Sequence, residues 1–178
     1  MRNNSFGRIG FAAFLICFGL VLGIAPPVFA QEDVEKHPAC PYCGMDRGKF
    51  AHSRMLIHYD NGTSLGTCSL HCAVIDQALK IDQMPREVLV GDFKSKKLID
   101  AERAYWVMGG DKMGVMTTRA KWAFESMPDA QGYISKHGGK LVTYEDAVKG
   151  AFEDMYQDIQ MIRNKRKMMK MKKMEKKQ

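Results

Sequence analysis

The sequence predicts an α+β fold, made of two small ββα-like halves followed by a long C-terminal helix. Three observations support this prediction. A cysteine-rich stretch at residues 37–50 precedes a strong hairpin signal and then a helix signal. A second series of short strands and one helix follows between residues 85 and 148. Beyond residue 145, apolar residues recur at spacings of three and four, which is typical of an amphipathic helix.

Residues 1–30 are expected to be a secretory signal peptide and not part of the fold. Two arginines precede the apolar run GFAAFLICFGLVLGIA, which is short for a membrane span, and PPVFA ends in an approximate small-x-Ala cleavage site. The mature chain would then begin at Gln31. Because no later segment resembles a stop-transfer sequence, we expect an exported protein that is periplasmic, or extracytoplasmic and membrane-associated. An uncleaved N-terminal anchor is the alternative.

The net charge of +7 is concentrated at the C-terminal end of the chain. Residues 163–178 contain nine Lys or Arg and one Glu, and residues 1–30 add two Arg, which leaves residues 31–162 with a net charge of −3. The basic isoelectric point therefore belongs to the tail and does not indicate nucleic-acid binding. Three interpretations of the tail stay open: a solvated helix end, a surface for anionic membrane headgroups or an acidic partner, or transient collection of Cu(I) by Met168, Met169, Met171 and Met174. Of the two functional interpretations, surface contact is favoured over metal capture.

The first half is predicted to contain a hairpin and a helix. Residues 53–60 have the composition of a strand, Asn61-Gly62 is a strong turn signal, and residues 63–67 would return as the partner strand. Ser69 is placed to cap a helix over residues 70–80. The helix residues expected to face the core are Ala73, Val74 and Ala78.

The second half is predicted to alternate short strands with a glycine-rich loop and a helix. Ser126 and Pro128 mark the start of this helix, and His137-Gly138-Gly139 marks its end. The other expected elements are strands at 87–93, 98–108 and 140–144 and a loop at 109–118. The apolar positions of the final helix, from residue 145 onward, are Val148, Phe152, Met155, Ile159 and Ile162.

Four cysteines beyond the signal segment form the pattern C-x2-C, 24 residues, C-x3-C: Cys40, Cys43, Cys68 and Cys72. Cys68 stands at the predicted helix start and Cys72 one turn later, so both sulfurs project from one face. A helix N-terminus also favours the thiolate, the form that binds metals. The pattern predicts a four-cysteine site of the structural-zinc type. Disulfides remain the alternative, because exported proteins meet oxidising conditions.

Nearby methionines favour copper over zinc. Cys43-Gly44-Met45 places a thiolate and a thioether two residues apart, and such soft ligands select Cu(I), whereas zinc rarely takes Met. The glycine-rich loop adds Met113 and Met116, in a segment where a Met has no core to fill. Three histidines are further candidate ligands, each more readily explained as a surface or capping residue: His37, His71 and His137.

These motifs resemble two known patterns. CPYCGM, a hairpin and TCSLHC are similar to the TRASH/YHS group of treble-clef metal-binding modules, in which Cys43, Cys68 and Cys72 match the metal cysteines. Over a longer span the chain resembles the NosL family, copper-delivering accessory proteins of nitrous-oxide reductase maturation. The segments that carry this likeness are CPYCGM from residue 40, AYWVMGGDKMGVMTTRAKWAFES from residue 104 and DAQGYISKHGGKLVTYEDA from residue 129.

The NosL resemblance implies Cu(I) binding by a Cys-x-Met motif and by a Met of the glycine-rich loop. In this sequence these are Cys43, Met45 and Met116, with Met113 as the neighbouring alternative to Met116. It also implies a metallochaperone that delivers Cu(I) to an apo copper enzyme such as nitrous-oxide reductase. Two features depart from the family pattern: the signal segment lacks a lipoprotein motif, and the second cysteine pair adds thiolates that many members lack.

These observations divide the chain into four parts. They are a signal peptide at 1–30, a treble-clef-like metal-binding half at 31–84, a second NosL-like α+β half at 85–148, and an amphipathic helix with a basic Met/Lys-rich tail at 149–178.

We expect a protein that is not an enzyme. No Ser-His-Asp arrangement, phosphate-binding loop or helical His-Glu-x-x-His pair is recognisable in the sequence. Two other functions stay open beside copper delivery. One is a protein-interaction module held by structural zinc. The other is a thiol-disulfide oxidoreductase that uses Cys40-Pro-Tyr-Cys43, although the segment lacks the preceding buried strand of thioredoxin-type enzymes.

Overall fold

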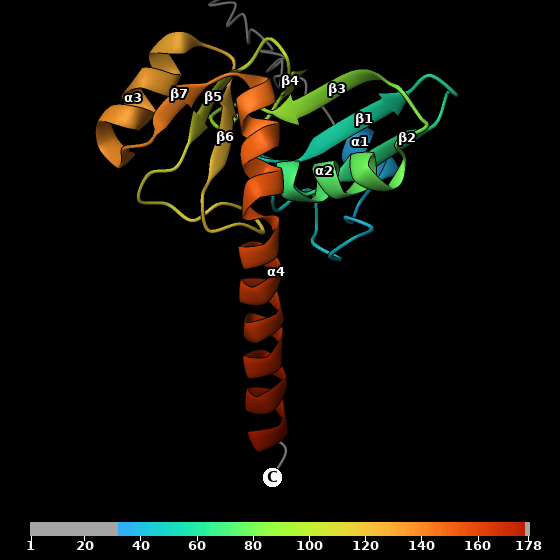
Figure 1. The fold of residues 1–178 in the computed structure, drawn as a ribbon, viewed down its shortest axis with the longest axis vertical. Helices are drawn as coiled ribbons and strands as arrows, with labels where there is room; N and C mark the ends of the chain where they lie inside the picture. Colours follow the sequence, from blue (N-terminus) through green and yellow to red (C-terminus); the bar gives the residue numbers. More distant parts are fainter. Residues whose placement is uncertain (1–31, 177–178) are drawn as a thin grey trace, which may run out of the picture. The chain divides into compact units, whose positions relative to one another are not determined.

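Two antiparallel sheets and four helices make up residues 32–176, the part of the chain that the computed structural model describes (Figure 1). The predicted signal peptide lies outside these residues. Contacts group Gln31–Gln178 into one unit, to which both sheets belong. In chain order the elements are α1 (Glu32–Lys36), β1 (Met55–Tyr59), β2 (Ser64–Thr67), α2 (Leu70–Leu79), β3 (Pro85–Gly91), β4 (Leu98–Asp100), β5 (Tyr105–Met108), β6 (Lys121–Phe124), α3 (Met127–His137), β7 (Lys140–Val142) and α4 (Tyr144–Glu175).

The predicted fold class is confirmed, because each half contains an antiparallel strand pair followed by a helix. The first half has β1, β2 and α2, and the second has β5, β6 and α3. The long C-terminal helix α4 follows both, and its last turns extend beyond the two sheets (Figure 1). Among the described residues, no helix combines the length and the apolar character that a membrane crossing requires.

The first sheet has the strand order β2-β1-β3-β4. The expected hairpin is present, with Met55 of β1 opposite Thr67 of β2. The turn contains Gly62 at a φ of 81°, the left-handed backbone that this turn signal predicts. β3 pairs with β1, and β4 pairs with β3, so the first sheet continues past residue 84, where the sequence analysis divides the two halves.

The second sheet has the order β6-β5-β7, and it corrects two expectations. The single strand expected over residues 98–108 was wrong, because β4 and β5 belong to different sheets. The chain turns between them where the Asp100 carboxylate accepts the backbone N–H groups of Glu102 and Arg103 at 2.9 and 3.3 Å. β6 was not predicted at all: all of its four residues are buried, so the strand shows no polar alternation.

The predicted helix boundaries agree with the structure. Ser69 and Ser126 stand at the N-caps of α2 and α3, and the Ser126 hydroxyl accepts the N–H of Asp129 at 3.3 Å. Gly138, at a φ of 72°, ends α3. α4 begins with a capping box in which the side chains of Thr143 and Asp146 bond each other's backbone N–H.

α4 packs through small residues on the core side. Ala147, Gly150 and Ala151 are buried, and a side-chain carbon at Gly150 would lie 2.7 Å from the sulfur of Met108. The apolar face predicted from residue spacing is therefore only partly correct: Val148 and Met155 pack against the core, whereas Phe152 is 46% exposed. On α2, Ala73 and Val74 are buried as expected, but Ala78 is exposed.

Candidate metal centre

The first cysteine pair lies in a tight turn before the hairpin. The N–H of Cys40 donates to the carbonyl of Met45, and the N–H of Gly44 donates to the carbonyl of Cys40, both at 2.8 Å. Gly44 adopts a φ of 76°, a conformation that side chains other than glycine rarely take. The glycine between Cys43 and Met45 therefore allows the knuckle to close. This turn is not the start of a helix, so the geometry lacks the thioredoxin arrangement.

The second pair comes from the end of the hairpin and the first turn of α2, and it meets the first pair in space. The four sulfurs of Cys40, Cys43, Cys68 and Cys72 all lie within 4.8 Å of one another. Cys43 Sγ is 3.3 Å and Cys72 Sγ is 3.8 Å from Cys68 Sγ.

All four thiols are free, and these separations exceed the roughly 2.05 Å of a disulfide bond. Sulfurs bound to one tetrahedral metal at about 2.3 Å would lie about 3.8 Å apart. The cluster therefore has the spacing and the donor chemistry that a thiophilic metal ion needs.

The thiols of this cluster do not share negative charge equally. Hydrogen bonds from Cys43, Cys68 and Cys72 lower the pKa of Cys40, which makes it the first thiolate. Hydrogen bonds with Cys40 and Cys43, that with Cys40 foremost, raise the pKa of both Cys72 and Cys68. A bound metal cation would stabilise all four sulfurs as thiolates. Because some of these thiols are protonated without metal, binding by all four sulfurs would release protons.

Tyr42 and Asp76 fasten the knuckle to α2. The Tyr42 hydroxyl donates to one carboxylate oxygen of Asp76, and the Tyr59 hydroxyl donates to the other. Asp76 is fully buried, and Lys80 Nζ lies 3.0 Å from it. Burial raises the pKa of Tyr42, so this hydroxyl remains a donor. The knuckle and the helix that carries Cys72 are therefore held as one rigid support.

A fully buried arginine holds the knuckle against the hairpin, and sequence analysis missed it. Arg47 donates to the carbonyls of Thr67 and Met55 at 3.0 and 2.9 Å, and to the carboxylate of Asp33 at 2.8 Å. Arg54 pairs with the same carboxylate. Charged residues are mostly exposed, so composition alone does not predict a buried arginine here.

A groove of about 480 Å³ opens beside the knuckle, and every predicted soft ligand outside the buried thiols lines it: Cys43, Met45, Met113 and Met116. Met45 and Met116 are half-buried, whereas Met113 is 52% exposed. Cys40, Cys68 and Cys72 are buried behind this surface. Cys43, which is half-buried, belongs both to the thiol cluster and to the groove.

His52 also lines the groove and was not among the predicted residues. Its ring packs against Phe93 and Trp122, with ring centroids 5.8 and 5.4 Å apart. Burial lowers the pKa of His52, so the neutral imidazole that can bind a metal predominates near neutral pH. No motif surrounds this histidine in the sequence, and only the fold brings it to the methionines.

None of the three predicted histidines lines the groove. His37 bonds the Ser64 hydroxyl at 3.1 Å, and His137 bonds the carboxylate of Asp111 at 3.1 Å. His71 is buried, which a surface role does not explain, and its Nδ1 lies 3.3 Å from the carboxylate of Asp158 on α4.

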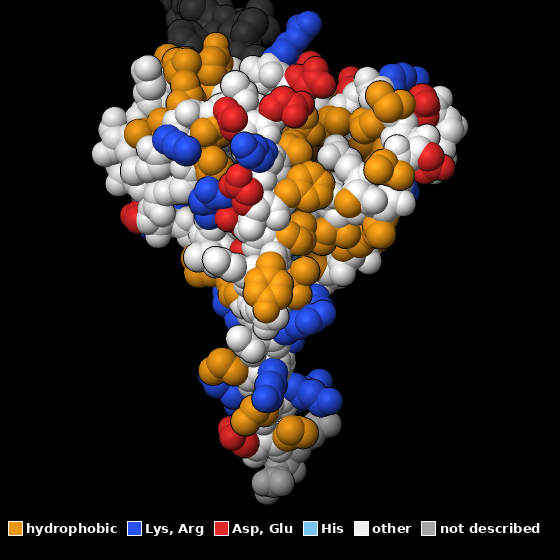
Figure 2. Space-filling view, viewed as in Figure 1, with side chains coloured by type: hydrophobic (Ala, Val, Ile, Leu, Met, Phe, Trp, Pro, Cys, Tyr) orange, Lys and Arg blue, Asp and Glu red, His pale blue; other side chains and the backbone are white. Residues whose placement is uncertain are grey.

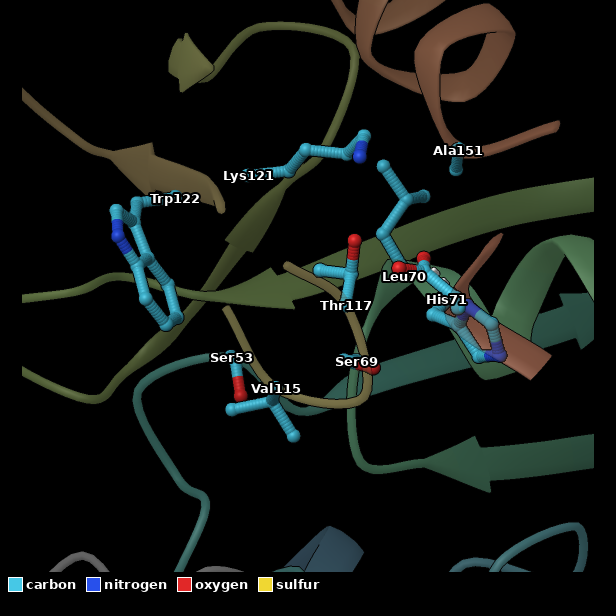
Figure 3. A pocket seen from close by; sticks show the side chains of 10 residues that line it. Ser53, Ser69, Leu70, His71, Val115, Thr117, Lys121, Trp122 and Ala151 are labelled. Carbon is cyan, nitrogen blue, oxygen red and sulfur yellow. Dashed lines mark ion pairs between the residues drawn. The ribbon is translucent and has the colours of Figure 1, made fainter. Parts of the chain in front are cut away.

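His71 faces a small internal cavity between α2, the loop at 109–118 and β6 (Figure 3). Asp158 reaches it from α4 and accepts the backbone N–H of Thr118 at 3.1 Å. Lys121 lies on another side of the cavity and pairs with Asp154 at 2.7 Å. These polar contacts join α4 to the helix that carries Cys72 and to the loop that carries Met113 and Met116.

Comparison with known proteins identifies a family and a similar solved structure. The model of the NosL family matches residues 31–152 of this chain. The crystal structure of the copper chaperone NosL from Shewanella denitrificans is similar at 21% sequence identity and a TM-score of 0.48, over 60% of this chain and 87% of that chain. No curated protein matches significantly.

Proposed function

Because this chain belongs to the NosL family, we propose that it is a metallochaperone that binds Cu(I) and delivers it to a copper enzyme. Family membership also confirms the expectation that the chain is not an enzyme. The observation that supports copper best is the groove, where Cys43 and Met45 from the knuckle meet Met113 and Met116 from a loop some 70 residues away.

The chemistry of these donors suits Cu(I) cargo. One thiolate with several thioethers is a soft ligand set. Such a set binds Cu(I) in preference to harder divalent ions. The groove is open to solvent on the side of Met113, so a ligand from another protein can approach the metal. Delivery then requires only the replacement of one sulfur ligand by another, with copper remaining Cu(I).

The double variant Cys43→Ser, Met45→Ala tests this proposal. We expect the native protein to bind about one Cu(I) in competition with a chromophoric chelator, and the variant to lose most of this affinity. Met84→Ala is the matched control, because Met84 is 67% exposed and lies outside the groove. Unchanged Cu(I) affinity in the double variant would exclude the groove as the copper site.

A second function is favoured by one specific observation, the convergence of four free thiols. In this alternative the four sulfurs hold a structural zinc ion, and the function of the protein is contact with other proteins. Metal analysis of protein purified under reducing conditions separates the two proposals. Tight zinc without any uptake of Cu(I) would favour the structural module.

We further propose where copper delivery takes place. Residues 1–30 would export the chain, and the recipient would be an extracytoplasmic apo enzyme such as nitrous-oxide reductase. Residues 163–178 would add contact with an anionic membrane surface. Figure 2 supports this contact, since several Lys and Arg side chains are exposed along the lower part of α4 on the face in view. The observed transfer of Cu(I) from the loaded protein to a purified apo recipient would establish the partner.

A further inference from the structure

One wall of the groove comes from α4, beyond residue 152, where the match to the family model ends. This wall consists of Met161, Ile162, Lys165, Arg166 and Met169. Their spacing places them on one face of the helix, with Met161 and Met169 two turns apart. Two more thioethers therefore face the cavity that Cys43, Met45 and Met116 line.

The contacts of α4 hold this wall against both other parts of the groove. The Thr118 hydroxyl donates to the sulfur of Met161 at 3.7 Å, which joins the helix to the methionine loop. One turn further along, Arg166 Nη2 donates to the carbonyl of Cys43 at 3.4 Å, which joins the helix to the knuckle. The buried Asp158 anchors the same helix to the N–H of Thr118. The position of the α4 wall is therefore fixed by specific bonds on both sides.

Core packing explains neither Met161 nor Met169. Met169 is 62% exposed, so its side chain fills no core. Met161 is half-buried, and it belongs to neither of the two hydrophobic clusters found among the described residues. A flexible thioether at the edge of an open cavity is suited to bind a soft ion and to release it again.

We propose that Met161 and Met169 are additional Cu(I) ligands, which form an exchange path along α4 into the groove. This inference rests on the proposed copper function and adds a second set of thioethers to it. Met169 is the exposed thioether of this path, Met161 is the thioether next to the methionine loop, and Cys43, Met45 and Met116 retain the copper. Each exchange replaces one sulfur on the metal by another, so neither an electron nor a proton is transferred between the thioethers.

The α4 helix provides its own matched control. Met168 and Met174 are 59% and 53% exposed and lie within the same basic segment as Met169, but they do not line the groove. Leucine preserves the size and the helix propensity of methionine and removes the sulfur. We therefore compare Met161→Leu, Met169→Leu with Met168→Leu, Met174→Leu in the otherwise unchanged protein.

The test has two readouts on these two double variants and the native protein. In the native protein, labelled with carbon-13 at the methionine methyl groups, added Cu(I) should shift the signals of Met161 and Met169 together with those of Met45 and Met116. Met161→Leu, Met169→Leu should weaken Cu(I) binding about tenfold, the scale on which neighbouring groups tune metal affinity, and slow transfer to a chelator. Met168→Leu, Met174→Leu should change neither.

The outcomes separate this inference from the proposed function. Shifts confined to Met45, Met113 and Met116, with native affinity and transfer rate in Met161→Leu, Met169→Leu, would overturn the α4 path and leave the copper groove intact. Equal losses in the two leucine variants would also overturn it, because the effect would then belong to the basic segment as a whole. If Cu(I) shifts no methyl signal of the groove, both proposals fall.

Discussion

At Met116 the backbone adopts a φ of 63°, in the left-handed region that residues with a side chain rarely occupy. This conformation costs about 1 kcal/mol for a residue with a Cβ, so it persists only where the surrounding structure holds it. The loop is rich in glycine, yet the strained position carries a thioether that lines the groove. Retention of a side chain at the cost of stability supports a role for Met116 in ligand binding.

This strain allows stability and binding to be separated at one residue. Met116→Ala removes the thioether and keeps the strain, whereas Met116→Gly removes both. We expect the glycine variant to be the more stable of the two by about 1 kcal/mol in denaturant unfolding, the reverse of the usual order. Both variants should lose Cu(I) affinity. An alanine variant as stable as the glycine variant would show that the conformation carries no cost.

Single residues also show the reach of sequence reasoning. The cysteine pairs, Met45 and the loop methionines were predicted from their spacing, their ligand chemistry and a family resemblance, and the fold brings all of them to adjoining sites. His52 and Met161 were missed, because nothing in the local sequence distinguishes a histidine or methionine that lines the groove from one that packs in the core. Only the folded structure shows that both residues line the groove.

At the scale of elements, α4 is the part that joins the thiol cluster to the groove. The carboxylate of Asp158 on α4 is buried between His71 and the backbone N–H of Thr118. His71 is next to Cys72 in the sequence, and Thr118 is two residues from Met116. The sequence periodicity predicted a helix here but only part of its buried face, to which small residues and Asp158 contribute in place of Phe152. Helix faces that pack through Ala and Gly give only a weak hydrophobic periodicity in the sequence. A buried aspartate is missed as well, because acidic residues are normally assigned to the surface.

Loss of the Asp158 carboxylate should loosen this junction. Asp158→Ala leaves the Thr118 N–H without its charged acceptor, and we expect the free energy of unfolding to fall by about 2 kcal/mol. Cu(I) affinity should fall as well, because α4 forms one wall of the groove. Glu153→Ala is the control on the same helix, since Glu153 is in an exposed ion pair with Arg119 and should contribute less than about 1 kcal/mol. Equal losses in the two variants would argue against a special role for Asp158.

At the scale of the whole molecule, Cys43 belongs to both candidate metal sites, the thiol cluster and the groove. It is the predicted thiolate of the groove and also one of the four sulfurs of the buried cluster. A metal held by all four thiols would use the Cys43 thiolate, so the full cluster and the copper groove would compete for this ligand. The hairpin and the helix caps were predictable because each depends on the local sequence. The convergence of the four cysteines was predictable from their spacing. The two assignments of Cys43, to the four-cysteine pattern and to the Cys-x-Met motif, were also predicted from the sequence. The wall that α4 adds to the groove beside Cys43 depends on packing between distant parts of the chain, which no local pattern encodes.

The charge of the molecule is unevenly distributed along the chain. Residues 31–162 are weakly acidic, whereas the end of α4 is strongly basic. Residues 163–178 carry a net charge of +8, and Lys and Arg side chains lie beside exposed methionines on the face of α4 in view (Figure 2). Each cation near an anionic bilayer contributes about 1 kcal/mol, an attraction that salt screens.

Deletion of residues 163–178 should therefore abolish binding to vesicles that contain anionic lipid, as measured by cosedimentation at low salt. Neutral vesicles should bind neither protein, and salt added to about 0.5 M should release the native protein, because the Debye length becomes shorter than the distance from most of the cations to the headgroups. The deletion also removes Met169 but keeps Met161, so Cu(I) should still bind, with slower exchange. Undiminished binding of the truncated protein to anionic vesicles would exclude the tail as the membrane contact.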